Sequence, residues 1–237
     1  SNGTNLGGMV HTNTGDADNP PYGNFPGPED VDNVPTGVFD EGDHDFYLYN
    51  DGDGSTRYDV DYPVQLTTFD SAFHDASIDV QPLPFALMED NYFMINGRGY
   101  PDTINPNSIT NDAFGMSGGK IANYDAQIMN AHIEAPLNAK IALRLSNVST
   151  TDLITVATTL GVPMRVVGRG AELLRNGVND TSYLVNTLNI GGGQAYDVII
   201  DTNGLAPGTY FLYTTNLQYL SNNDEERGGI MTEIVIN

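Results

Sequence analysis

The chain of 237 residues is strongly acidic, with 31 Asp and Glu against 9 Lys and Arg and a formal net charge of -22. This charge repels phosphate backbones and anionic membranes, which argues against nucleic acid as a partner, and no stretch approaches the roughly 20 apolar residues of a membrane span. The absence of cysteine excludes disulfides, thiolate catalysis and every cysteine-ligated metal site.

Residues 1–61 have the composition of a loop. They contain 13 of the 31 acidic residues but a single basic one, Arg57, and five prolines between Pro20 and Pro35 rule out a regular helix. We predict that residues 1–70 form a long, irregular, acidic arm that drapes over a sandwich or packs on a neighbouring subunit. Residues 71–237 are predicted to form the folded domain.

The glycine-kinked loop Asp51-Gly-Asp-Gly-Ser-Thr56 brings carboxylates close together, as a calcium loop does. The spacing does not match that of a calcium-binding loop, however. With Gly54 as the turn glycine, the last ligand position, which needs a bidentate Glu, is occupied by Val60. We therefore interpret the loop as a hairpin turn between Phe46–Tyr49 and Arg57–Val60. An irregular calcium site is the alternative, and its candidate ligands are Asp51, Asp53 and Asp59.

The next segments predict strands and turns. Residues Tyr58 to Asp70 alternate apolar and polar side chains around Pro63, which predicts an edge or entry strand. The apolar run Tyr92–Ile95 ends at Asn96-Gly97, which is a tight-turn signal. The stretch Gly115 to Gly119 matches Gly-x-Ser-x-Gly, but no strand precedes it and no helix former follows, so a serine hydrolase is rejected.

From Ala139 onward the pattern is that of an all-β sandwich. Ile141, Leu143 and Leu145 alternate with Ala142 and Arg144, a period of two that predicts a strand with one buried face. Short runs separated by glycines follow, as a Greek-key sandwich requires. The predicted strands are Lys140–Val148, Thr151–Thr158, Met164–Gly168, Tyr183–Ile190, Ala195–Asp201, Thr209–Thr215 and Ile230–Ile236.

Several motifs carry a resemblance to a known family: Ile95-Asn-Gly97, Arg144-Leu-Ser-Asn147, Pro163 to Gly168, Tyr196-Asp-Val-Ile-Ile-Asp201, Pro207-Gly-Thr-Tyr210 and Gly228-Gly-Ile-Met231. In this order they resemble the second, middle cupredoxin-type domain of a bacterial multicopper oxidase. The resemblance implies an all-β, Greek-key, cupredoxin-like β-sandwich in an exported protein, whether periplasmic, cell-surface or extracellular. Residues 1–70 would then correspond to a remnant of a first cupredoxin domain.

Copper-bearing domains of this family have a His-x-His pair before the Val-Val-Gly strand and a His-Cys-His run after Pro-Gly-Thr-Tyr. Here Thr151 to Gly161 contains no histidine, and the second run reads Leu212-Tyr-Thr-Thr-Asn216. A type 1 copper centre needs two imidazoles, a thiolate and a weak axial ligand, so Met231 is interpreted as a core residue. The resemblance therefore implies a domain without copper or catalytic residues of its own, within a parent enzyme that uses copper.

Three functions are weighed. The first is a copper-free structural module whose partners are other cupredoxin domains or copies of itself. The second is an extracellular assembly protein whose acidic arm docks on a neighbouring subunit, with calcium as a possible cofactor. The third is an enzyme with its own general base at His74-Asp75 or at His132 beside Glu134, and we interpret these histidines as surface residues instead.

Overall fold

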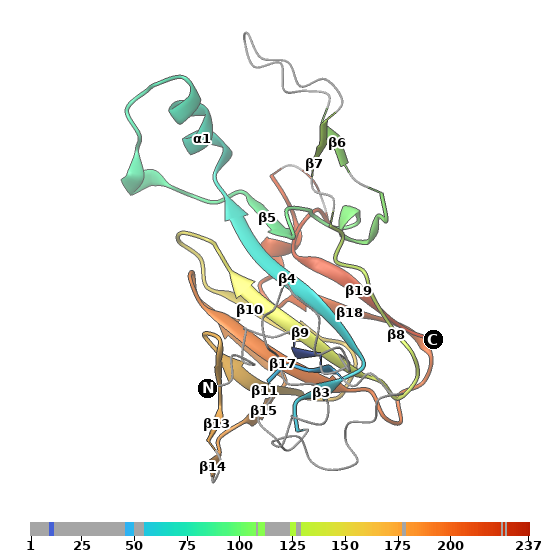
Figure 1. The fold of residues 1–237 in the computed structure, drawn as a ribbon. Helices are drawn as coiled ribbons and strands as arrows, with labels where there is room; N and C mark the ends of the chain where they lie inside the picture. The colour runs from blue at the N-terminus through green and yellow to red at the C-terminus, as the bar shows by residue number, and fades with distance from the viewer. Residues whose placement is uncertain are drawn as a thin grey trace, which may run out of the picture.

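The structure is a computed structural model, and it describes residues 10–11, 46–49, 55–107, 109–111, 124–126, 129–176, 179–223, 225 and 227–237. Two sheets pack face to face and form a β-sandwich, which confirms the predicted all-β, Greek-key class (Figure 1). The chain passes repeatedly from one sheet to the other, so neighbouring strands within a sheet are seldom consecutive in sequence.

The larger, seven-stranded sheet has the order β12-β11-β17-β9-β4-β5, and β15 also pairs with β11. Most of its neighbouring strands are antiparallel, whereas β4 and β9 run parallel. Its strands are β4 (Val60–Phe69), β5 (Tyr92–Ile95), β9 (Lys140–Asn147), β11 (Met164–Arg169), β12 (Glu172–Leu173), β15 (Tyr183–Val185) and β17 (Ala195–Asp201).

The smaller, five-stranded sheet has the order β16-β10-β18-β19-β8. The strand β8 joins it in parallel beside β19, and the other pairs are antiparallel. Its strands are β8 (Ile133–Ala135), β10 (Ile154–Thr158), β16 (Thr187–Ile190), β18 (Gly208–Thr214) and β19 (Met231–Ile236).

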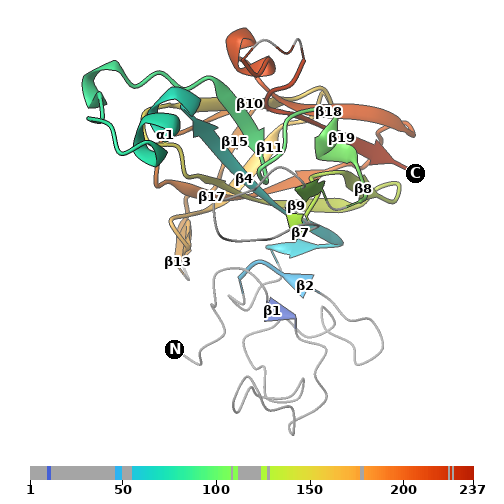
Figure 2. The same cartoon turned by 90° about the horizontal axis from the view of Figure 1, so that it is seen from above.

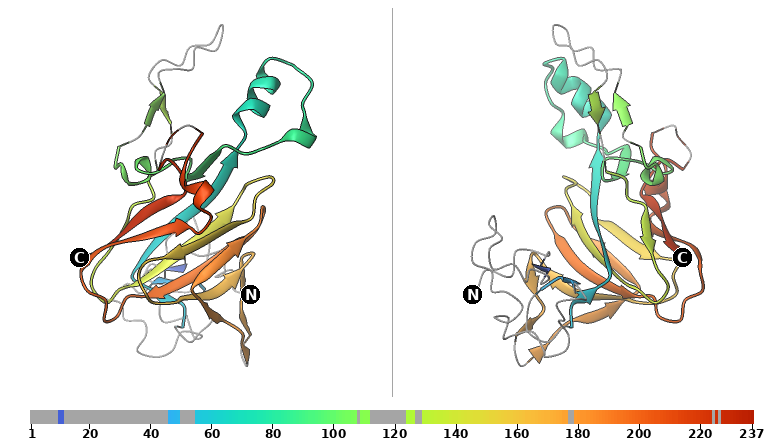
Figure 3. Two further views of the ribbon diagram at one scale, coloured as in Figure 1. Left: turned by 180° about the vertical axis from the view of Figure 1, so that it is seen from behind. Right: turned by 45° about the vertical axis from the view of Figure 1, so that its right-hand side comes forward.

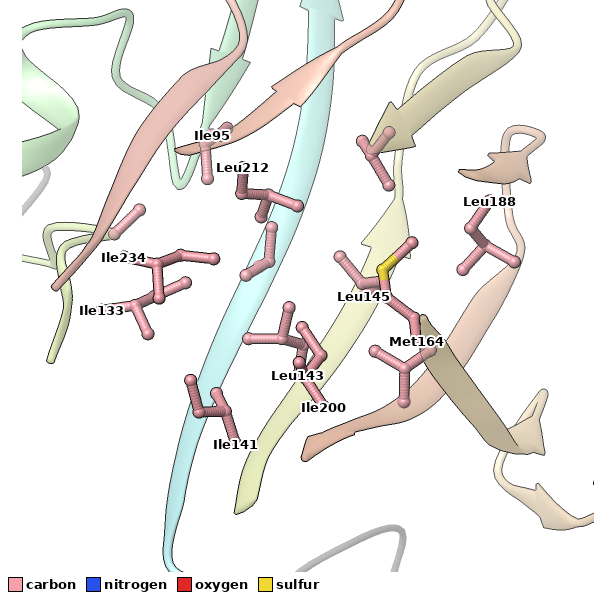
Figure 4. Packing of buried hydrophobic residues seen from close by; sticks show 14 of the residues in the cluster. Ile95, Ile133, Ile141, Leu143, Leu145, Met164, Leu188, Ile200, Leu212 and Ile234 are labelled. Atoms are coloured by element: carbon pink, nitrogen blue, oxygen red, sulfur yellow. The ribbon is translucent and has the colours of Figure 1, made fainter. Parts of the chain in front are cut away.

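The hydrophobic core fills the space between the two sheets (Figure 4). The predicted inward residues Ile141, Leu143 and Leu145 are buried in it, next to Ile234 and Leu212 of the opposite sheet. Burying a large aliphatic side chain contributes about 1.5–3 kcal/mol, so this layer supplies most of the driving force for folding. The period of two along β9 therefore correctly predicted which residues face the core, but the prediction of a single buried face was wrong, because Ala142 on the opposite face is also buried, in a second cluster with Leu48 and Tyr49.

The predicted run Tyr183–Ile190 is two strands rather than one. Its first half, β15, pairs with β11 in the seven-stranded sheet, and its second half, β16, pairs with β10 in the five-stranded sheet. The chain therefore crosses between the sheets at Asn186, and the prediction of a single strand was wrong because both halves have the same strand-favouring composition.

The strand β4 shows why a proline can lie within this sheet. Pro63 pairs with Arg144 of β9 on one side, while β5 covers the other side of β4 only from Leu66 to Phe69. On that open side the carbonyl of Pro63 accepts a hydrogen bond from the Asn96 amide. The first half of β4 is thus an edge, where a missing N–H is tolerated.

A short three-stranded sheet lies against the outer face of the seven-stranded sheet, on the side away from the core (Figure 2). Its strands are β1 (Val10–His11), β2 (Phe46–Tyr47) and β3 (Arg57–Tyr58). The antiparallel pairing of β2 with β3 confirms the predicted hairpin. Leu48, Tyr49 and Tyr58 are almost completely buried there, with Ala142, Val167 and Ile199 beneath them.

The connection between β4 and β5 leaves the sandwich as a loop of residues 71–90, here called the projecting loop. It contains α1 (Ser71–Ile78) and the short helix η2 (Phe85–Leu87), and it stands clear of both sheets (Figure 3). The remaining elements are η3 (Asp102–Ile104), β6 (Ile109–Asn111), β7 (Tyr124–Ala126), β13 (Arg175–Asn176), β14 (Asn179–Asp180) and η4 (Leu217–Leu220).

Candidate functional site

The two segments in which the family resemblance places copper ligands lie side by side. Strand β10 pairs with β18, so that Val156 faces Thr214 and Thr158 faces Leu212, and Met231 of β19 pairs with Tyr213. Val156, Leu212 and Thr214 are completely buried. The fold therefore assembles the expected positions, but they present aliphatic and hydroxyl side chains instead of imidazoles.

These residues do not fit a copper centre. The chain has no cysteine to supply a thiolate, and within the described residues no group of three or more His, Cys, Asp or Glu side chains converges. Copper sites of the type 1 class need imidazole and thiolate donors in a trigonal arrangement. No step of copper chemistry can be derived from the side chains that occupy β10, β18 and β19.

The two histidines with described side chains have ordinary structural environments. His74 lies on α1, not on a strand, and its ring stacks on Phe69 with 4.0 Å between the ring centroids. His132 Nδ1 lies 3.5 Å from the carboxylate of Glu134 at the surface. Within the described residues, neither histidine belongs to a group of three or more His, Cys, Asp or Glu side chains, and Glu134 is the one carboxylate paired with His132.

Of the three calcium candidates, only Asp59 lies within the described residues, because Asp51 and Asp53 fall outside them. Asp59 Oδ2 accepts a hydrogen bond of 2.7 Å from the Lys140 backbone N–H, and its other oxygen lies 3.0 Å from the Arg57 guanidinium. Asp59 therefore joins β3 to β9 through protein contacts. The calcium site remains a prediction.

Two carboxyl groups meet at the rim of the sandwich, where the projecting loop returns to it. Asp90 accepts hydrogen bonds from the hydroxyls of Thr68 and Thr151, and Asp152 accepts one of 2.8 Å from Tyr219. Burial, together with a hydrogen bond and charge repulsion from Asp90, raises the pKa of Asp152. Sequence reasoning missed this pair, because its members are far apart in the chain and only the fold brings them together.

A network on the outer face fixes the short three-stranded sheet to the sandwich. The hydroxyl of Tyr49 donates a hydrogen bond of 2.5 Å to Asp197, and burial together with this bond strongly raises the pKa of Tyr49. Nearby, Arg144 forms an ion pair of 3.1 Å with Asp61. Arg165 similarly lies 3.0 Å from Asp180, so both arginines are ion-paired.

A hollow of about 260 Å³ opens on the same outer face, beside Ser55, and is here called the outer-face hollow. Its apolar walls come from Val162, Pro163, Leu184 and Ile199, and its charged groups are Lys140, Arg165 and Asp201. It is smaller than the roughly 300–1,000 Å³ of pockets that hold drug-sized ligands. A hollow of this size is suited to a few side chains rather than to a cofactor.

Comparisons with known proteins give a consistent result. The profile of the multicopper oxidase family matches residues 77–235. Among solved structures, the chain is similar to the blue copper oxidase from Nitrosomonas europaea, with a TM-score of 0.53, 20% identity, and coverage of 74% of this chain and 43% of the other. It is also similar to the multicopper oxidase mgLAC, with a TM-score of 0.53, 16% identity, and coverage of 75% and 44%. At these identities the likeness shows the fold alone.

No curated protein matches the chain, and none of the described helices is long and apolar enough to cross a membrane. The chain spans less than half the length of the two solved structures to which it is similar. The family profile, by contrast, covers more than half of the 237 residues and includes the strands from β5 to β18 and all but the last residue of β19. The chain therefore belongs to the multicopper oxidase family.

Proposed function

We propose that the chain is a copper-free, cupredoxin-like module of an exported multicopper oxidase-type protein, with a structural rather than a catalytic role. One observation carries the proposal: β10, β18 and β19 bring together the positions where the family resemblance places copper ligands, and fill them with buried Val156, Leu212 and Thr214. Any copper chemistry would belong to other domains of a parent protein. The proposal that the protein is exported is based on the family resemblance.

The proposed partners are other cupredoxin domains or copies of the same chain, in keeping with the chain's share of the longer solved structures. The proposed division is an arm of residues 1–70 and a sandwich of residues 71–237. Because β4 pairs with β9 along seven residues, we propose moving the start of the sandwich to about Val60.

Copper loading tests the proposal directly. The purified chain is incubated with excess Cu²⁺, dialysed, and its bound copper is determined by mass spectrometry of the metal. The expected result is far less than one copper per chain. Retention of one copper per chain, together with its loss in His74→Ala or His132→Ala, would contradict the proposal, and thermal melts of both variants check that they remain folded.

The alternative function is an extracellular assembly protein whose acidic arm docks on a neighbouring subunit, with calcium. One observation favours it: Leu48, Tyr49 and Tyr58 are buried against the outer face of the seven-stranded sheet. This face therefore binds residues from the N-terminal quarter of the chain. Calorimetric titration with Ca²⁺ tests it. Binding heat that disappears in the Asp51→Asn/Asp53→Asn variant would support the alternative, and the absence of heat in the unchanged protein would contradict it.

A further inference from the structure

The projecting loop exposes a cluster of large apolar side chains. Ile78, Val80, Phe85 and Leu87 are 69%, 88%, 69% and 78% exposed, and no residue of α1 is buried. Single exposed apolar residues are normal at a protein surface, but four of them on one loop of residues 71–90 form a patch that favours a partner.

The projecting loop is held in shape by its own contacts. The Asp70 carboxylate accepts hydrogen bonds of 2.9 Å from the backbone N–H groups of Phe73 and Glu89, which closes the base of the loop. The rings of Phe73 and Phe85 pack edge to face at 5.1 Å. Val80 adopts a φ of 55°, a conformation that a β-branched residue rarely adopts. The apolar cluster is therefore presented in a defined shape.

The charge of the projecting loop restricts its partner. Residues 71–97 contain no Lys or Arg, and Asp75, Asp79 and Glu89 are exposed among the apolar side chains. On a chain with a net charge of -22, most surfaces would repel such a loop. A suitable partner surface is apolar and carries cationic groups at its edge.

The same chain carries such a surface at the outer-face hollow. Its walls include Val162, Ile199 and Leu184, which is 65% exposed. Arg165 is engaged by Asp180 and Ser182, whereas the Lys140 ammonium makes no ion pair within the described residues. Asp201 also lines the hollow and partly offsets these charges.

Basic residues concentrate on four strands, two of which, β9 and β11, contribute Lys140 and Arg165 to the lining of this hollow. Six of the nine Lys and Arg residues of the chain lie on β3, β9, β11 and β13, namely Arg57, Lys140, Arg144, Arg165, Arg169 and Arg175. Five carboxylates lie on neighbouring strands, and Asp59 lies between β3 and β4. The five are Asp61, Glu172, Asp180, Asp197 and Asp201. The charges of these twelve residues balance, whereas the chain as a whole is strongly acidic, so this set repels an acidic loop less than an average part of the chain does.

The hollow and the projecting loop of one chain cannot meet. Strand β4 separates them, since Val60 pairs with Ile141 next to Lys140, and Phe69 leads into the loop. A strand of ten residues is about 33 Å long. Figure 1 shows α1 of the projecting loop beyond the Phe69 end of β4, whereas the hollow lies near the Val60 end, because Lys140 lines it. Contact between them therefore requires two molecules.

We propose that chains associate head to tail, the projecting loop of one chain packing Phe85 and Leu87 against the outer-face hollow of the next. The acidic residues of the loop then lie beside Lys140. Because the two contact surfaces differ, the association is heterologous, and it produces either a closed ring or an open filament. The inference does not depend on the absence of copper from the chain.

Sedimentation equilibrium tests the proposal on the whole chain. The weight-average mass is expected to rise above 25.6 kDa with concentration. Both Phe85→Ser/Leu87→Ser, which alters the loop, and Lys140→Glu/Leu184→Ser, which alters the hollow, are expected to stay monomeric. Leu217→Ser is the matched control, because Leu217 is 77% exposed but belongs to neither surface, and it is expected to associate like the unchanged chain.

A mixture of the two altered proteins gives the sharpest result. The loop variant keeps an intact hollow, and the hollow variant keeps an intact loop. An equimolar mixture is therefore expected to form a dimer through this one contact and no larger assembly. A monomeric mixture would overturn the head-to-tail arrangement, and a monomeric unchanged chain at all concentrations would overturn self-association altogether. Thermal melts that match the unchanged chain confirm that both variants are folded.

Discussion

Gly168 lies where β11 passes beneath the ring of Tyr49. A β-carbon at this position would lie 2.8 Å from Asp197 Oδ2, and still closer to the Tyr49 hydroxyl. Since Tyr49 is only 1% exposed, its ring has little room to withdraw. We therefore expect Gly168→Ala to destabilise the chain by about 1–3 kcal/mol, the usual cost of overpacking, as measured by urea denaturation.

A double-mutant cycle shows whether this cost arises at the Tyr49 contact. Tyr49→Phe alone removes the hydrogen bond to Asp197 and is expected to cost about 1 kcal/mol. Without the hydroxyl, the alanine side chain at position 168 meets less obstruction. The double variant should therefore lose less unfolding free energy than the two single variants lose together. Additive losses would show that Gly168 is required for another reason.

Asp152 and Asp90 give the fold a distinct pH dependence. The folded-state pKa of Asp152 is raised above its unfolded value, chiefly by burial and then by Asp90, so the native state takes up a proton first as the pH falls. Its contribution to stability is therefore least favourable at neutral pH and improves down to about pH 4, near the unfolded pKa.

Asp152→Asn should therefore stabilise the chain at pH 7. An amide keeps the acceptor for Tyr219 and can donate to Asp90, so a gain of about 1 kcal/mol is expected, or about 2–4 °C in Tm. The gain should vanish below about pH 4. Asp75→Asn, at an exposed position on α1, is the control and should change Tm little at either pH; a gain for Asp152→Asn that is independent of pH would contradict this account.

At the scale of elements, Arg98 organises the loop that follows β5. Its side chain is 2% exposed and donates to the carbonyls of Asp102, Asn105 and Asn107 at 3.1, 2.6 and 2.9 Å. One buried guanidinium thus satisfies several carbonyl groups that no strand pairs. The loop is therefore held by this residue together with the hydrogen bond from the Thr103 hydroxyl to the Met231 carbonyl.

Replacing Arg98 by methionine keeps much of the side-chain volume but removes the guanidinium donor from the carbonyls of Asn105 and Asn107, whereas the Asp102 carbonyl keeps the Asn105 N–H. The expected cost is about 2–4 kcal/mol, with faster hydrogen exchange at the amides of Thr103, Ile104 and Asn105. Arg169→Met is the control, because Arg169 is exposed and stacks on Tyr196, and a small effect is expected. Unchanged exchange in the Arg98 variant would show that the loop is held by other contacts.

The elements differ in how far the sequence predicts them. Ala195–Asp201 matches β17 at both ends, because alternating apolar residues are bounded there by glycine and asparagine turns. The crossing at Asn186 could not be predicted, because it depends on which strand each half of the run meets. The helix α1 was also not predicted, since it buries none of its residues and so lacks an amphipathic pattern.

The candidate sites also differ in how far the sequence predicts them. Motifs within single segments predicted the cupredoxin-like fold and identified the segments in which copper ligands were missing. The Asp90–Asp152 pair, the Tyr49–Asp197 bond and the outer-face hollow each join residues from distant segments. Such sites depend on tertiary pairing, for which a single sequence carries no periodic signal.

For the whole molecule, the dominant physical fact is the net charge of -22, which opposes compaction through self-repulsion. Basic residues concentrate on a few strands, and several of them are engaged in ion pairs with Asp59, Asp61 and Asp180. Most remaining carboxylates therefore lack a basic partner, and salt should stabilise the chain by screening them.

Raising the ionic strength from about 0.01 M to about 1 M shortens the Debye length from about 30 Å to 3 Å. We expect Tm to rise over this range, and Mg²⁺ and Ca²⁺ at matched ionic strength to act alike, because screening depends on charge and not on ion identity. Differential scanning calorimetry provides the measurement. An additional rise with Ca²⁺ alone, absent in Asp51→Asn/Asp53→Asn, would reveal a specific site and favour the assembly function, because screening cannot distinguish two divalent cations.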